Sequence, residues 1–133
     1  MSQENVEIVK RAAEALANGD LDAATDSFDP DIEWEETAGL GPDADVYQGI
    51  EEVRAAVESW LGMWSEYEIE ARRYVDVDDD VVALFTERGR GRDSGVVVER
   101  ELGEVLTVRG GKIVRSRLFG SWQEALEAAG LSE

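Results

Sequence analysis

The chain has 133 residues, and its 31 acidic residues against 13 basic ones give a formal net charge of −18. This length fits one domain with one core, and the acidic balance argues against nucleic acid or an anionic membrane as a partner. The absence of cysteine and histidine excludes disulfides, thiol redox chemistry, a Ser-His-Asp triad and the usual histidine-bearing zinc sites. Residues 1–4 contain no basic or apolar targeting segment, and no apolar run is long enough to span a membrane, so we expect a cytoplasmic protein.

Helices dominate the first half of the predicted structure. Apolar residues at helical spacing and turn residues mark the boundaries of the elements. In chain order, the pattern predicts a helix over 4–17, a short helix over 20–28, a strand over 32–36, a mobile loop over 37–46 and a longer helix over 49–64. We interpret the loop as a lid, because its glycines and acidic residues stand between a strand and a helix.

Strands dominate the second half. Alternating apolar and charged residues predict strands over 67–77, 81–92, 96–109 and 112–120. A final helix begins with a capping box, Ser121 with Glu124, and stops at Gly130. Helices followed by a long meander predict a single α+β domain over residues 1–133, with helices covering one face of a twisted antiparallel sheet.

Three segments carry a resemblance to a known family. They read NGDLDAATDSFDPDIEW, YQGIEEVRAAVESW and GGKIVRSRLF, in that order along the chain. Together they resemble SnoaL-like proteins of the nuclear-transport-factor-2-like (NTF2-like) superfamily. The resemblance implies a cone, in which a curved antiparallel sheet wraps around three to four helices and encloses a pocket. It also implies a homodimer formed through the outer sheet face. It does not fix the function, since this pocket hosts isomerases, cyclases, dehydratases, hydrolases and non-catalytic binders.

Strand alternation within residues 96–108 singles out two charged residues. One face of this strand is mostly apolar, with Leu102 and Leu106 among its members, yet it also carries Arg100 and Glu104. A charge on a buried face needs a partner, water or a pocket, because an unpaired buried charge is costly. Two interpretations remain open: a buried ion pair or solvated strand end, and polar groups that line a ligand cavity.

Glu36 ends the first predicted strand, next to the predicted loop. Its context, FDPDIEWEE, resembles that of ketosteroid isomerases in the same superfamily. The resemblance implies that Glu36 stands where those enzymes place their general base, and that Glu104 stands near their second, protonated acid. The pocket tyrosine of those enzymes falls on Ala12, so the isomerase pattern is incomplete here.

Aromatic residues are the other candidates for a pocket. Trp60 and Trp64 are four residues apart on one predicted helix, where core packing is the first interpretation. Trp34 could wall the pocket mouth, and Tyr47 and Tyr67 could donate hydroxyl hydrogen bonds. The predicted ligand pocket comprises Trp34, Tyr47, Trp60, Trp64, Arg100, Leu102, Leu106, Ser116 and Leu118, with Glu36 and Glu104 as the catalytic candidates.

Three arginines, Arg88, Arg90 and Arg92, alternate on one strand face. They could bind an anion, but cross-strand pairs with Glu99 and Glu101 are the favoured interpretation in so acidic a chain. Such pairs would suit a sheet face that forms a dimer, and we expect Val97 and Val105 to be exposed on the same outer face.

Three functions are consistent with the sequence. The first is an enzyme that acts on a small apolar substrate without metal or other cofactor, with Glu36 or Glu104 as acid or base and Tyr47 or Arg100 as a polarising donor. The second is a non-catalytic protein that binds a hydrophobic metabolite, and the third is a dimeric interaction domain. An enzyme requires at least two polar groups that converge on one point of the cavity, whereas a binder does not.

Overall fold

The computed structural model describes residues 2–37 and 45–131. The helices within these stretches are α1 (Ser2–Ala17), α2 (Leu21–Thr25), α3 (Ile50–Gly62) and α4 (Trp122–Ala128). The strands are β1 (Phe28–Glu36), β2 (Val46–Gln48), β3 (Trp64–Val77), β4 (Asp80–Gly91), β5 (Val97–Arg109) and β6 (Lys112–Phe119). None of the described helices is both long and apolar enough to cross a membrane.

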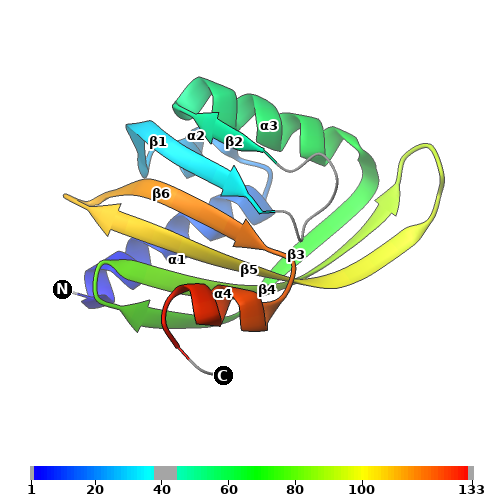
Figure 1. The fold of residues 1–133 in the computed structure, drawn as a ribbon. Coiled ribbons are helices and arrows are strands. Elements are labelled where there is room, and N and C mark those ends of the chain that lie inside the picture. Colours follow the sequence, from blue (N-terminus) through cyan, green and yellow to red (C-terminus); the bar gives the residue numbers. More distant parts are fainter. Residues whose placement is uncertain (1, 38–44, 132–133) are drawn as a thin grey trace.

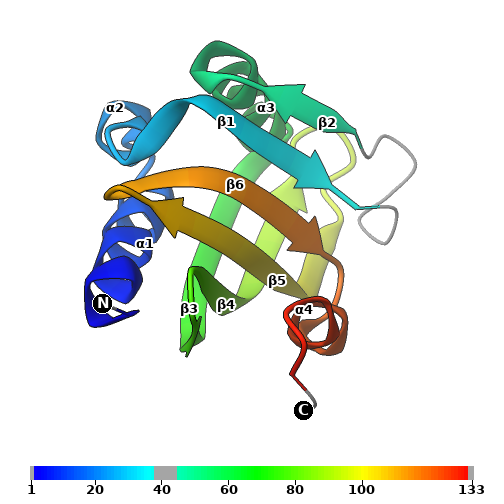
Figure 2. The same ribbon diagram turned by 60° about the vertical axis from the view of Figure 1, so that its left-hand side comes forward.

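The six strands form one curved sheet in the order β2-β1-β6-β5-β4-β3. All neighbours are antiparallel except β1 and β6, which are parallel, so the sheet is mixed rather than antiparallel throughout. Figures 1 and 2 show the sheet curling around α1 and α3, which lie on its inner, concave side. The α+β architecture and the cone are therefore as the sequence predicts.

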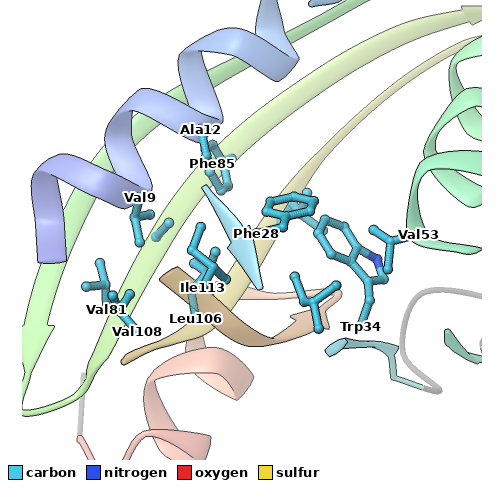
Figure 3. Packing of buried hydrophobic residues seen from close by; sticks show 13 residues of the cluster. Val9, Ala12, Phe28, Trp34, Val53, Val81, Phe85, Leu106, Val108 and Ile113 are labelled. Carbon is cyan, nitrogen blue, oxygen red and sulfur yellow. The ribbon is translucent and has the colours of Figure 1, made fainter. Parts of the chain in front are cut away.

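The main core fills the space between α1, α3 and the concave face of the sheet. Figure 3 shows Val9 and Ala12 of α1 directed toward the sheet, and Val53 of α3 beside Trp34 of β1. Val9 and Val53 are almost completely buried, and each buried side chain of this size stabilises the fold by about 1.5–3 kcal/mol. Three residues of this core, Trp34, Phe85 and Leu102, also line a cavity beneath the helices.

The position of helix α4 differs from the prediction, in which all helices cover one face of the sheet. It packs on the outer, convex face, where Ala125 and Leu126 join Val82, Leu84 and Val105 in a second core. Val105, predicted to be exposed on a dimer face, is 1% exposed. Figure 2 shows α4 outside the curve of the sheet.

The chain before the sheet differs from the predicted boundaries. The short second helix ends at Thr25 instead of Phe28. Asp20 caps its start by accepting a hydrogen bond from the Ala23 N–H at 3.1 Å. Strand β1 starts at Phe28 and contains Pro30. The β1–β6 ladder is interrupted between Phe28 and Glu33, so the missing N–H of Pro30 interrupts no regular pairing with β6.

The segment around the predicted lid contains an element that the sequence did not indicate. Strand β2 pairs with β1, with Tyr47 opposite Trp34. Residues 38–44, which make up most of the predicted lid, lie outside the described residues. At its edges, the Thr37 hydroxyl and N–H both donate to the Leu118 carbonyl oxygen.

Helix α3 is shorter than predicted, because it ends at Gly62 and Trp64 begins β3. Trp60 and Trp64 therefore do not share a helix face. Trp64 lies against Gly89 of β4, where a Cβ atom would be 2.6 Å from the indole ring. The glycine leaves room for the indole on the sheet surface.

Candidate functional site

A cavity of about 430 Å³ lies between the concave face of the sheet and the helices α1 and α3. This volume is in the range of small-molecule sites. Its wall is mostly apolar, with a few polar side chains that come from α3 and from β1, β2, β3, β4 and β5. The lining residues include Trp34, Glu36, Tyr47, Trp60, Tyr67, Phe85, Glu87, Arg100, Leu102, Glu104 and Leu118.

Two carboxyl groups stand in one row across the sheet. Leu118 of β6 pairs with Glu36 on one side and with Glu104 on the other. Because neighbouring strands are about 4.8 Å apart, the Cα atoms of the two glutamates are about 10 Å apart. All three residues line the cavity, so both carboxyl groups can reach a molecule that lies over Leu118.

Glu104 is the more deeply buried of the two glutamates, with 8% of its surface exposed. The Ser116 hydroxyl, which is fully buried, donates a hydrogen bond to Glu104 Oε2. Burial raises the pKa of Glu104 from its ordinary value of 4.5 to about 7, and the hydrogen bond from Ser116 opposes this rise. A pKa near neutral pH is the property that favours a carboxyl group as a general acid or base.

Glu36 is less perturbed than Glu104. Burial raises its pKa, the charge of Asp45 raises it further, and a hydrogen bond with the Trp34 side chain lowers it. Asp45 is close because the Glu36 N–H donates to the Asp45 carbonyl oxygen at 2.8 Å. The two cavity carboxyl groups thus have different environments.

A second polar cluster lies at another part of the cavity wall. Glu87 of β4 is 6% exposed and stands directly opposite Arg100 of β5 in the sheet register. The Tyr67 hydroxyl donates to Glu87 Oε1, and Arg100 Nε donates to Glu87 Oε2. The guanidinium of Arg100 also lies over the ring of Trp60, 5.4 Å from its centroid. Arg100 therefore satisfies both interpretations from the sequence, because it forms a buried ion pair and lines the cavity.

Three aromatic rings pack together beside this polar cluster. The rings of Trp60 and Trp64 meet edge to face with centroids 5.2 Å apart, and Tyr67 lies 6.3 Å from Trp60 and 6.1 Å from Trp64. Such packing restricts the orientation of the Trp60 ring and of the Tyr67 hydroxyl. The charges of the cluster are consequently held in place before any ligand binds.

Comparison with known proteins identifies the family to which this chain belongs. The model of the SnoaL-like domain matches residues 9–116. The chain belongs to the SnoaL-like family. Among curated proteins, none matches it.

Solved structures agree with this SnoaL-like assignment. An NTF2-like protein from Burkholderia thailandensis is 28% identical, with a TM-score of 0.81 over 95% of this chain and 96% of the other. A putative SnoaL-like polyketide cyclase from Jannaschia is 19% identical, with a TM-score of 0.78 over 89% and 85% of the two chains. TerC, co-crystallised with polyporic acid, is 17% identical, with a TM-score of 0.78 over 96% and 98%. At the identities of the last two, the likeness concerns the fold alone.

Most of the pocket residues expected from the sequence of this SnoaL-like chain lie in the cavity wall. Those that line it are Glu36, Glu104, Trp34, Tyr47, Trp60, Arg100, Leu102 and Leu118. Three others do not: Trp64 packs behind Trp60, Leu106 is part of the main core, and Ser116 lies behind Glu104. Ala12, at the position implied for the isomerase tyrosine, is a buried core residue.

Sequence reasoning missed Glu87 as a cavity residue. The signal was present, since Val81, Ala83, Phe85 and Glu87 alternate along β4 and all face the concave side or the cavity. Phe85 lines the cavity next to it. The same alternation rule that identifies Arg100 and Glu104 on β5 would have identified Glu87.

Arg88 and Arg90 lie on β4 and Arg92 follows it, and all three donate hydrogen bonds within the protein. Arg88 Nε donates to Glu99 at 2.8 Å, as the cross-strand interpretation predicts. Within the part of the chain that the structure describes, Glu101 forms no such pair; it accepts a hydrogen bond from the Trp122 N–H at the start of α4. Arg92 donates to the carbonyl oxygens of Gly62 and Trp64 and so closes the junction between α3 and β3.

The residues described in 2–37 and 45–131 include no group of three or more acidic side chains that could hold a metal ion.

Proposed function

We propose that this SnoaL-like protein is a cofactor-free acid–base enzyme that acts on a small apolar molecule bound in the cavity, with Glu104 as the proton-transfer group. The observation that carries the proposal is a buried carboxyl group that lines an apolar cavity and has its pKa raised to about 7. A carboxyl group of this kind is poised to take or give a proton near neutral pH.

Glu36 is the second participant in this proposal. It lies on the other side of Leu118 from Glu104, so a planar molecule over Leu118 meets a carboxyl group at each edge. Because burial raises the pKa of Glu36 as well, a bound ligand that excludes water strengthens both perturbations. Glu104 is assigned the proton transfer because its burial is nearly complete.

The apolar wall supports a hydrophobic ligand. Trp34, Phe85, Leu102 and Leu118 line the cavity between its two polar regions, and burial of a ligand's apolar surface against them is favourable. The names of two neighbours, a putative polyketide cyclase and a protein crystallised with polyporic acid, are compatible with such a ligand. The proposal itself rests on the cavity of this chain.

The second candidate function is a non-catalytic binder of a hydrophobic metabolite. The observation that favours it is Ala12, which supplies no hydroxyl where the resemblance to ketosteroid isomerases implies a tyrosine. A binder needs the apolar wall but makes no use of a proton-transferring Glu104.

We also propose that the protein is a homodimer through the part of the convex face that α4 leaves uncovered. Val97, at the start of β5, is 37% exposed there, and the Arg88–Glu99 pair lies next to it on the same two strands. An exposed apolar side chain beside paired charges is compatible with a contact between two copies.

The test of the enzymatic proposal is an unnatural reaction that needs only a base in an apolar cavity. In 5-nitrobenzisoxazole, a base removes the proton at carbon 3, the N–O bond breaks, and the product is a coloured cyanonitrophenolate. Here the Glu104 carboxylate would accept the proton, and the N–O bonding electrons would leave on the phenolate oxygen. We expect a rate above the buffer rate that increases with pH through about 7, following ionisation of Glu104.

Matched variants separate the interpretations of this rate. Glu104→Gln should abolish the protein-dependent rate, whereas Glu68→Gln, a change of an exposed glutamate on β3, should leave it intact. A rate that survives in Glu104→Gln, or no rate above buffer in the wild type while the probe binds, would refute the proton-transfer role and favour the binder.

A further inference from the structure

We propose that Arg100 forms a specificity site that binds an uncharged oxygen acceptor of the ligand, such as a carbonyl oxygen, at the end of the cavity away from Glu104. This inference rests on the part of the proposed function that places a small apolar molecule in the cavity. It adds the chemical class of that molecule and its orientation.

The guanidinium of Arg100 has N–H groups that are available to a ligand. Its Nε donates to Glu87, and among residues 2–37 and 45–131 the two Nη atoms have no hydrogen-bond partner. The side chain is 30% exposed and lines the cavity. An oxygen atom of a ligand can therefore accept hydrogen bonds from Arg100 without displacing Glu87.

The position of Arg100 is fixed by its neighbours. Glu87 holds it from the adjacent strand, the Tyr67 hydroxyl holds Glu87, and the ring of Trp60 lies under the guanidinium. A donor held in this way loses little freedom when a ligand binds, which favours a specific geometry. Glu87 and Tyr67 are positioning residues, because they act through Arg100.

The charges around Arg100 favour a neutral acceptor over an anion. The positive charge of Arg100 is already balanced by the buried carboxylate of Glu87, which is 5% exposed at its side chain. Glu36 and Glu104 add two further acidic groups to the same cavity, and the whole chain has a formal net charge of −18. A carboxylate ligand would bring another negative charge into a poorly solvated site, whereas a carbonyl oxygen would not.

The strand geometry sets the distance between the two ends of the site. Arg100 and Glu104 are four residues apart on β5, so their Cα atoms are about 13 Å apart at about 3.3 Å per residue. Leu102 lies between them and Phe85 stands opposite Leu102 in the register. The cavity thus fits a molecule of about two fused rings, with an oxygen at the Arg100 end and the site of proton transfer at the Glu104 end.

Three naphthalenes of nearly equal size test this inference directly. They are 2-acetylnaphthalene with a neutral carbonyl, 2-naphthoate with a carboxylate, and 2-ethylnaphthalene with no acceptor, and their dissociation constants are measured by equilibrium dialysis at pH 7.5. Because a hydrogen bond to a charged donor adds about tenfold or more in affinity, we expect 2-acetylnaphthalene to bind about tenfold more tightly than 2-ethylnaphthalene. We expect 2-naphthoate to bind more weakly than 2-acetylnaphthalene.

A double variant assigns this preference to the cluster. Arg100→Leu with Glu87→Gln removes both charges together, so no charge is left buried alone, and it should make the acetyl and ethyl compounds bind equally. The control is Arg88→Leu with Glu99→Gln, which removes an ion pair from the same two strands on the outer face and should keep the preference.

The possible contrary results separate failure of the Arg100 site from failure of the apolar-ligand proposal. Equal binding of the acetyl and ethyl compounds by the wild type, tightest binding of 2-naphthoate, or a preference that survives in the double variant would overturn the role of Arg100 and leave the apolar-ligand proposal standing. Should none of the three compounds bind, the apolar-ligand proposal and this inference would both fail. If the double variant does not fold, the wild-type ranking decides.

Discussion

Replacing Glu104 by glutamine should stabilise the protein increasingly as the pH rises from 5 to 8.5. In the folded state burial raises the pKa of Glu104 from 4.5 to about 7, whereas in the unfolded chain the group is solvated. Below pH 4.5 both states hold the proton and the group contributes no pH dependence. Between pH 4.5 and pH 7 the unfolded chain loses the proton of Glu104 while the folded protein keeps it, so the wild-type protein loses stability over this range. Above pH 7 the folded protein also carries the buried charge, and the loss is complete. The glutamine side chain of the variant has no proton to lose and avoids this loss.

The magnitude follows from the two pKa values. Each pH unit over which only the unfolded state ionises costs about 1.36 kcal/mol, so the total is about 3 kcal/mol, most of it between pH 5 and pH 8.5. The glutamine oxygen can still accept the hydrogen bond from Ser116, and any penalty for its buried amide N–H₂ is independent of pH. The prediction therefore concerns the slope of the difference and not its absolute value.

The assay is urea unfolding followed by tryptophan fluorescence at several pH values, for the wild type and for Glu104→Gln. Taking the difference between the two proteins cancels the titration of all other groups. The control Glu68→Gln, at an exposed position of β3, should show a small difference of constant size. A difference for Glu104→Gln that is flat from pH 5 to 8.5, or that falls with pH, would refute the buried-charge reasoning.

Three further predictions concern the rest of the structure. Gly103→Ala should lower the free energy of unfolding by about 1–3 kcal/mol, because its Cβ would be 2.5 Å from the Cβ of Ala125 in α4; wild-type stability in urea would contradict this contact. Ser121→Ala should cost about 1 kcal/mol by the same measurement, because the Ser121 hydroxyl accepts the Glu124 N–H at the start of α4; an unchanged midpoint would mean that this cap is unimportant. Sedimentation at micromolar concentration should give twice the chain mass of 14.7 kDa, and a single species at the chain mass would exclude the proposed dimer.

The alternation of side chains on β5 could be predicted because the strand has no bulge in its pairing with β4. From Val97 to Thr107 its pairing with β4 continues without a bulge, so a period of two correctly brings Arg100 and Glu104 to the concave side. The capping signal at Ser121 is also confirmed, since it depends only on residues three apart.

Other features depend on contacts between distant residues and could not be predicted in this way. Trp64 fits the apolar spacing of the preceding helix as well as that of a strand, and only its pairing with Gly91 assigns it to β3. Which sheet face α4 would cover depends on the close approach that Gly103 permits to Ala125. The bond from Tyr67 to Glu87 requires two neighbouring strands in register, and a single strand's pattern does not contain it.

Carbon-13 NMR of the glutamate side-chain carboxyl carbons shows whether Glu104 is a proton-transfer group that a ligand in the cavity can reach. Glu104→Gln identifies the resonance, and the titration is run with and without saturating 2-acetylnaphthalene. We expect a titration midpoint near pH 7 in the free protein and a higher midpoint in the complex, because the ligand displaces water from the carboxyl group. A midpoint near 4.5, or one that the bound ligand leaves unchanged, would contradict it.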